Sequence, residues 1–133
     1  MITSNKPGKI LIVDDNKSVL HALNMLLKPE FAAIQTLPGP VNLLTSIDSF
    51  NPDVVLLDMN FKAGESSGNE GLFWLREIKK HHPSVEVVMF TAYGEVDLAV
   101  IATREGAADF VVKPWDNEKL TATLRAAYRL RES

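Results

Sequence analysis

The chain has 133 residues and no cysteine; hydrophobic residues make up 46% and charged residues 23%, and the formal net charge is −3. This composition is typical of one globular domain with its own core, and it excludes a disulfide framework and a thiolate metal site. No basic cluster, apolar span of membrane length or signal peptide is visible, so we expect a cytoplasmic domain that contacts neither nucleic acid nor membrane.

Short β-branched runs alternate with helical patterns along the whole chain. The strand at 53–57 is apolar on both faces, and the helical segments place apolar residues three and four positions apart. Prolines and glycines separate these segments. In chain order we expect strand 9–13, a helix from residue 16 to Pro29, strand 31–37, helix 41–50, strand 53–57, helix 70–82, strand 85–90, helix 95–105, strand 108–112 and helix 116–131.

Five strands alternating with five helices predict an α/β fold, in which helices cover both faces of a parallel sheet. At this length we expect a flavodoxin-like (βα)5 three-layer sandwich with strand order 2-1-3-4-5. Residues 9–131 would form this domain, preceded by a flexible N-terminal segment 1–8 and followed by residues 132–133. In such folds ligands bind at the carboxyl ends of the strands.

Polar side chains stand at four of these carboxyl ends. Taken singly, an aspartate after a strand often only caps the next helix, and a lone lysine is usually solvated. Together, three carboxylates, a hydroxyl and an ammonium group at one edge favour a functional site. The candidates are Asp14, Asp15, Asp58, Thr91 and Lys113.

Three neighbouring carboxylates would raise one another's pKa unless a cation neutralised them. Oxygen ligands in an incomplete protein cage suit Mg²⁺, which keeps several waters. Mg²⁺ beside a lysine suits a phosphoryl group, and a carboxylate nucleophile would then form an aspartyl phosphate. We expect Asp58 to be this nucleophile, because it stands alone on a central strand while the pair Asp14 and Asp15 serves the metal.

These residues lie in four motifs, VDD at 13–15, LLDMN at 56–60, FTA at 90–92 and VVKP at 111–114. With them the chain resembles the receiver domain of two-component response regulators over residues 9–131. The resemblance implies that Asp58 accepts a phosphoryl group from a phosphohistidine of a sensor histidine kinase. It also implies a signalling module that catalyses only its own phosphorylation and dephosphorylation, and is not otherwise an enzyme.

The resemblance further assigns roles to the other motif residues. Asp15 would bind Mg²⁺ directly and Asp14 through water, with Asp58 and the backbone carbonyl of Asn60 as further ligands. Lys113 would pair with the phosphoryl group, and the peptide bond before Pro114 would be cis. Thr91 and Phe110 would be the switch residues that move after phosphorylation.

Three segments resemble the N-terminal receivers of NtrC-type, sigma-54-dependent transcriptional activators: LLDMNF, GNEGLFWLREIK and FVVKPWDNEKL. By this resemblance we expect the chain to be cut from a longer regulator whose output domains are absent. A phosphorylation-dependent homodimer is a further expectation.

The loop 60–71 is long and rich in glycine and serine, so we expect it to be mobile. We also expect Tyr93 to cover part of the pocket. One alternative is a degenerate receiver that binds proteins without phosphorylation, although every phosphotransfer position is filled.

A haloacid-dehalogenase-like phosphohydrolase is a weaker alternative, because its general acid would fall at Asn60, which cannot transfer a proton. A flavodoxin-like nucleotide binder is disfavoured as well, because no glycine-rich loop follows the first strand.

Overall fold

The computed structural model describes residues 6, 8–61 and 69–132. Residues 1–5, 7, 62–68 and 133 lie outside this description. Most of the segment 1–8 and of the loop 60–71, both expected to be mobile, therefore falls outside it.

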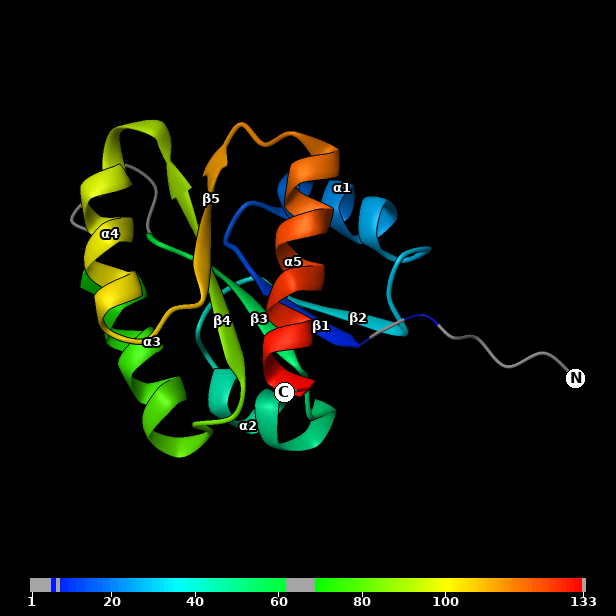
Figure 1. The fold of residues 1–133 in the computed structure, drawn as a ribbon, viewed down its shortest axis with the longest axis horizontal. Coiled ribbons are helices and arrows are strands. Elements are labelled where there is room, and N and C mark those ends of the chain that lie inside the picture. The colour runs from blue at the N-terminus through cyan, green and yellow to red at the C-terminus, as the bar shows by residue number, and fades with distance from the viewer. Residues whose placement is uncertain (1–5, 7, 62–68, 133) are drawn as a thin grey trace, which may run out of the picture.

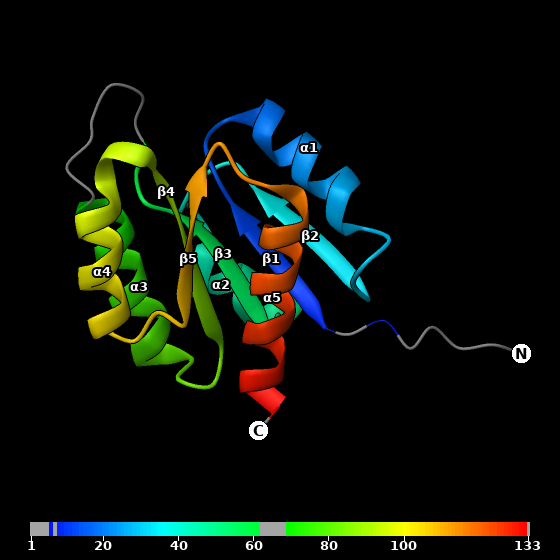
Figure 2. The same ribbon diagram turned by 45° about the horizontal axis from the view of Figure 1, so that its top comes forward.

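The five strands form one parallel sheet in the order β2-β1-β3-β4-β5, which confirms the predicted fold. All four neighbouring pairs are parallel, so the carboxyl ends of all five strands lie at one edge of the sheet, the upper edge in Figures 1 and 2. The strands are β1 (Lys9–Val13), β2 (Ala33–Leu37), β3 (Val54–Asp58), β4 (Glu86–Ala92) and β5 (Asp109–Lys113).

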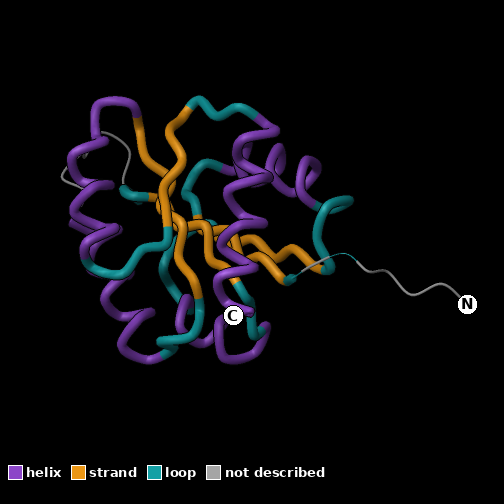
Figure 3. Tube along the Cα trace, viewed as in Figure 1, coloured by secondary structure: helices purple, strands orange, loops and turns teal. Residues whose placement is uncertain are grey.

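Helices cover both faces of the sheet and give three layers (Figure 3). Helices α1 and α5 pack on one face, and α2, α3 and α4 pack on the other. A short 3-10 turn, η1 (Tyr93–Glu95), connects β4 to α4. The helices are α1 (Lys17–Leu27), α2 (Leu43–Phe50), α3 (Asn69–His81), α4 (Val96–Arg104) and α5 (Asn117–Glu132).

Alternate residues of the central strands supply the two halves of the core. In β1, Ile10 and Ile12 belong to the cluster with α1 and α5, whereas Leu11 and Val13 belong to the cluster with α2, α3 and α4. Because successive side chains of a strand point to opposite faces, a strand buried on both sides must be apolar at every position. In the three central strands, polar side chains therefore stand only at or next to the strand ends.

Most element boundaries lie within one residue of the sequence-based prediction, and three differ from it by two residues. The second strand begins at Ala33 because Phe31 is only 1% exposed and its backbone N–H donates to the carbonyl of Leu27 at the end of α1. Helix α2 begins two residues late, after Asn42 in the left-handed conformation. Strand β4 continues to Ala92 because its last residues pair with the end of β5.

Gly71, in the first turn of α3, lies against the residue that follows β3. Its backbone N–H donates to the carbonyl of Met59 at 2.9 Å. A Cβ atom at this position would lie 2.7 Å from both the Cα and the carbonyl oxygen of Met59. The absence of a side chain thus permits α3 to begin directly beside the end of β3.

We predict that Gly71→Ala lowers the free energy of unfolding by about 1–3 kcal/mol, because the added methyl group overlaps backbone atoms that cannot move easily. Urea unfolding followed by circular dichroism measures this change. Gly39→Ala is the matched control, since a Cβ there meets no atom within 4 Å. Equal stability of the two variants would contradict the predicted overlap.

Candidate functional site

The carboxyl edge of the sheet brings the predicted acidic and basic groups together. Asp14 and Asp15 directly follow β1, Asp58 is the last residue of β3, and Lys113 is the last residue of β5. One carboxylate oxygen from each of the three aspartates lies within 4.8 Å of the others. The Lys113 Nζ lies 2.8 Å from Asp14 Oδ2 and 3.2 Å from Asp58 Oδ1.

Asp14 is fully buried, and both of its oxygens accept hydrogen bonds. Its Oδ1 accepts from the backbone N–H of Asn16 at 2.9 Å, and its Oδ2 accepts from Lys113. The cap of α1 is Asn16, whose side chain accepts from the N–H of Val19. Asp14 therefore supports the lysine and the loop after β1, while Asp15 beside it is exposed.

Lys113 is held between the carboxylates and an aromatic ring. Its Nζ lies 4.7 Å from the centroid of the Phe90 ring, and Trp115 packs against that ring with centroids 5.5 Å apart. Burial alone would lower the pKa of Lys113, but its hydrogen bond to Asp14 and the charge of Asp58 raise it on balance. The side chain is therefore a permanent cation at neutral pH.

Asp58 is the carboxyl group most affected by this environment. It is 4% exposed, and burial together with the charge of Asp14 raises the pKa of Asp58 to about 7. The charge and hydrogen bond of Lys113 and the N–H of Asn60 oppose that rise. One ammonium group does not fully offset two buried carboxylates, so the site favours a further cation.

The donor set fits a hard divalent cation. Asp14, Asp15 and Asp58 offer only oxygen atoms, and the exposed Asp15 leaves one side open to water. Mg²⁺ prefers such ligands and retains water molecules. The three aspartates therefore provide an acidic cluster of the kind that can hold this ion.

Of the two predicted switch residues, Thr91 lies at the carboxyl edge and Phe110 lies farther down β5. Thr91 is fully buried, and its hydroxyl donates to the carbonyl oxygens of Ala92 and Glu95, each at 3.4 Å. Phe110 is half-buried and packs against the core cluster under α2, α3 and α4. The peptide bond between Lys113 and Pro114 is cis, as predicted.

Glu95 is a residue of this edge whose role the sequence did not reveal. Its side chain is buried, and its carboxylate accepts hydrogen bonds from the Asn60 amide group and, at 3.4 Å, from the N–H of Ala92. The spacing of Ala92 and Glu95 matches half of a capping box, but the contact with Asn60 has no local signal. Tyr93 is 81% exposed, so the expectation that it covers the pocket is wrong.

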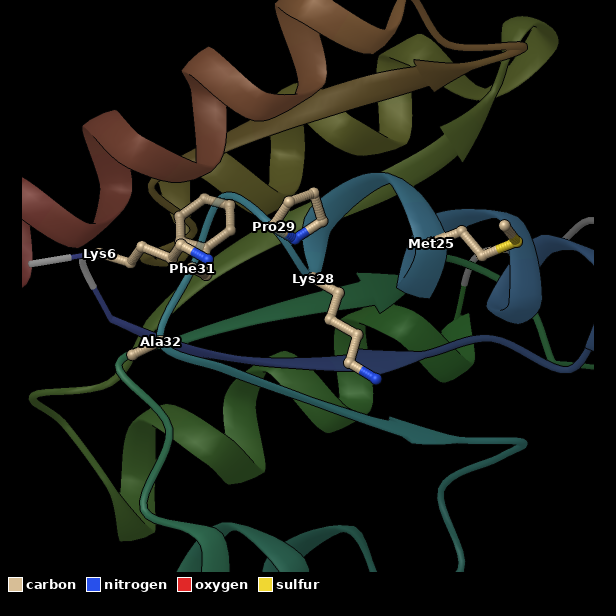
Figure 4. A pocket seen from close by; sticks show the side chains of 6 residues that line it. All are labelled: Lys6, Met25, Lys28, Pro29, Phe31 and Ala32. Atoms are coloured by element: carbon tan, nitrogen blue, oxygen red, sulfur yellow. The ribbon is translucent and has the colours of Figure 1, made fainter. Parts of the chain in front are cut away.

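A cavity of about 620 Å³ lies at the opposite edge of the sheet (Figure 4). It is located where α1 ends and β2 begins, and none of the described residues that line it is a carboxylate. Its lining residues are Lys6, Met25, Lys28, Pro29, Phe31 and Ala32. This cavity therefore shares no residue with the acidic site. Within the described residues, none of the helices has the length and apolar character needed to cross a membrane.

Comparison with known proteins identifies the family whose members share this arrangement. The model of the response regulator receiver domain matches residues 10–125. Among solved structures, the N-terminal signal receiver domain of a two-component response regulator from Bacteroides fragilis is 56% identical. Its TM-score is 0.82, and the match covers 90% of this chain and 95% of that one. The receiver domain of NtrX from Brucella abortus is 32% identical with a TM-score of 0.81, over 90% of this chain and 98% of that one.

Curated relatives are longer proteins that match through one part of their sequence. The DNA-binding transcriptional regulator NtrC of Escherichia coli (strain K12) is 32% identical over 90% of this chain and 24% of its own length. The transcriptional regulatory protein ZraR of Klebsiella oxytoca is 35% identical over 98% of this chain and 29% of its own length. The chain thus spans about a quarter of the curated relatives that it matches.

The raised pKa of Asp58 predicts how stability depends on pH without a divalent cation. The folded state binds the Asp58 proton more tightly than the unfolded state, whose ordinary pKa is 3.8. Protonated Asp58 therefore contributes to the free energy of unfolding below about pH 4, and this contribution is lost as the pH rises to about 7.

We predict that Asp58→Asn removes this loss and raises the free energy of unfolding at pH 8 by about 2 kcal/mol, since one pKa unit corresponds to about 1.4 kcal/mol and water screens part of the shift. Urea unfolding of both proteins in chelator from pH 4 to pH 8 measures the difference. Parallel pH profiles would contradict the prediction.

Proposed function

Since this chain belongs to the response regulator receiver domain family, we propose that Asp58 accepts a phosphoryl group from a phosphohistidine of a sensor histidine kinase. The observation that carries this proposal is the position of Asp58. It is buried at the end of a central strand, 3.2 Å from the Lys113 ammonium group and beside two further carboxylates. A buried carboxylate next to a fixed cation is oriented for attack and favours an anionic product.

In the transfer, a carboxylate oxygen of Asp58 forms a bond to phosphorus while the bond from phosphorus to the histidine nitrogen breaks. The imidazole leaves with the bonding electron pair, and the product on this chain is an acyl phosphate. Lys113 pairs with the phosphoryl oxygens while Asp14 keeps it in place. Asp14, Asp15, Asp58 and the backbone carbonyl of Asn60 would hold Mg²⁺, which offsets the negative charge of the phosphoryl oxygens.

The phosphoryl group then competes for the hydroxyl of Thr91. In the unphosphorylated protein this hydroxyl donates to carbonyl oxygens of its own turn. A phosphoryl oxygen is a stronger acceptor, so Thr91 turns toward Asp58 and the half-buried Phe110 moves into the space behind it. The surface made by α4, β5 and α5 changes with them, which makes the domain a two-state switch rather than an enzyme with a separate substrate.

The longer relatives support an output through another domain of a longer protein. Residues 9–131 would form the receiver, and an output domain elsewhere in a longer protein would respond to it. The whole protein would then be a transcriptional regulator that acts in the cytoplasm. A phosphorylation-dependent homodimer would be one route from the switch to the output. The receiver would not contact nucleic acid itself, since its net charge is −3.

We predict that the purified chain gains the mass of one phosphoryl group when it is incubated with acetyl phosphate and Mg²⁺. Asp58→Asn removes the acceptor and should abolish the gain, as should a chelator. Intact-mass spectrometry measures the result. Asp48→Asn is the matched control, because Asp48 is an exposed carboxylate on α2 and should leave the gain unchanged.

Two results would contradict the proposal. A gain that persists in Asp58→Asn would assign the acceptor to another residue. No gain in the unmodified chain at any Mg²⁺ concentration would favour a receiver that binds partners without phosphorylation.

We further predict that Thr91→Val still accepts the phosphoryl group but no longer responds to it, because the variant keeps the shape of the side chain and lacks the hydroxyl. Hydrogen exchange of α4 and β5, measured by mass spectrometry with and without acetyl phosphate, should change in the unmodified chain and stay nearly constant in the variant. A full response in Thr91→Val would show that the hydroxyl is not needed for the switch.

A further inference from the structure

Glu95 connects two loops at the edge of the sheet that holds Asp58. Its carboxylate accepts from the side chain of Asn60, in the loop after β3, and from the N–H of Ala92, the last residue of β4. Its own carbonyl accepts from the Thr91 hydroxyl. We call these three contacts the Glu95 bridge.

The groups in the Glu95 bridge flank the proposed acceptor. Asn60 is two residues beyond Asp58, and the Ala92 N–H directly follows Thr91. A hydroxyl has one proton to donate, so Thr91 cannot donate fully to the Glu95 carbonyl and to a phosphoryl oxygen together. The carboxylate of Glu95 likewise occupies a backbone N–H that an incoming anion at this edge would attract.

Helix capping accounts for only part of this arrangement. A glutamate in the third position of a helical turn commonly accepts from the backbone N–H at the cap, as Glu95 does with Ala92. Capping does not explain the contact with Asn60, which lies 35 positions away on a different loop. Nor does it explain the burial, because Glu95 is only 9% exposed whereas glutamates in first turns are normally solvated.

We propose that Glu95 is a positioning residue that stabilises the unphosphorylated arrangement, so that phosphorylation has to break the Glu95 bridge. This inference rests on the proposed function of Asp58. In the unphosphorylated protein the bridge holds the turn after β4 against the loop after β3 and keeps the Thr91 hydroxyl directed at the turn. Weakening the bridge therefore favours the phosphorylated state.

The test uses beryllofluoride with Mg²⁺, a stable phosphoryl analogue, titrated into the whole chain. Trp115 packs against Phe90, next to Lys113, so its fluorescence reports binding. We expect Glu95→Gln, which keeps the shape and removes the charge, to lower the concentration at half-saturation about fivefold, since a charged hydrogen bond is stronger than a neutral one. Asn60→Ala removes the donor of the same hydrogen bond and should lower the half-saturating concentration by a similar factor.

The double variant distinguishes a bridge from two separate effects. If Glu95 and Asn60 act through their shared hydrogen bond, Glu95→Gln combined with Asn60→Ala gains little over either single change. Asp97→Asn is the matched control, because Asp97 is an exposed carboxylate in the first turn of α4 and should leave binding unchanged. Urea unfolding of each variant separates binding effects from loss of stability.

The outcomes separate this inference from the proposed function. Three results would overturn the bridge while Asp58 remains the acceptor. They are a half-saturating concentration that is unchanged or higher in both single variants, fully additive effects in the double variant, and an equal effect of Asp97→Asn. Binding by the variants without binding by the unmodified chain would support a bridge that is stronger than expected. If neither the unmodified chain nor any variant binds beryllofluoride or gains a phosphoryl group, the proposed function fails and the bridge fails with it.

Discussion

The contact of the Lys113 ammonium group with two buried carboxylates is the interaction on which the site depends. Asp14 and Asp58 end two neighbouring strands, and each would lose hydration without compensation if no cation lay between them. Lys113 reaches both from the far edge strand, at 2.8 Å and 3.2 Å. Lys113 therefore allows the three strand ends to stay close together, with Asp58 buried beside a fixed cation.

The contact leaves a charge imbalance, because one ammonium group faces two carboxylates. Burial, and after it the charge of Asp14, raises the pKa of Asp58 to about 7, and the adjacent Lys113 offsets only part of that rise. A fully neutralised site would have no affinity for a further cation, and a site without Lys113 would repel a phosphoryl anion. Partial neutralisation leaves a site that favours a divalent cation, and under the proposed function that cation and Lys113 would together offset the charge of a phosphoryl group.

Sequence reasoning identified the strand ends because the physical signal there is strong. In a sheet buried on both faces, an aspartate after an apolar strand such as β3 is conspicuous, and parallel strands place all such residues at one edge. The convergence of Asp14, Asp15, Asp58 and Lys113 could be predicted for this reason. The strand order could not be read from the pattern, and its prediction rested on the chain length and the alternation of strands and helices.

What the sequence could not predict depends on contacts between loops. The hydrogen bond from Asn60 to Glu95 joins residues whose spacing follows no helical or strand period. Tyr93 could equally have turned inward, and only the path of the 3-10 turn leaves it 81% exposed. The start of β2 was misplaced because Phe31 looks like a strand residue, whereas it fills the core just beyond α1.

The charged side chains and the two predicted switch residues, Thr91 and Phe110, lie on opposite faces of the sheet. Side chains alternate along a strand, and paired residues of parallel strands point to the same face. Asp58 pairs with Phe90, and Lys113 follows the same alternation as Val111, so the charged groups extend toward the side of α1 and α5. Thr91 and Phe110 alternate with these positions and point toward the side of α4. Under the proposed function, a phosphoryl group on Asp58 would act on α4 by drawing Thr91 around the end of β4, and the turn that Glu95 contacts lies on that path.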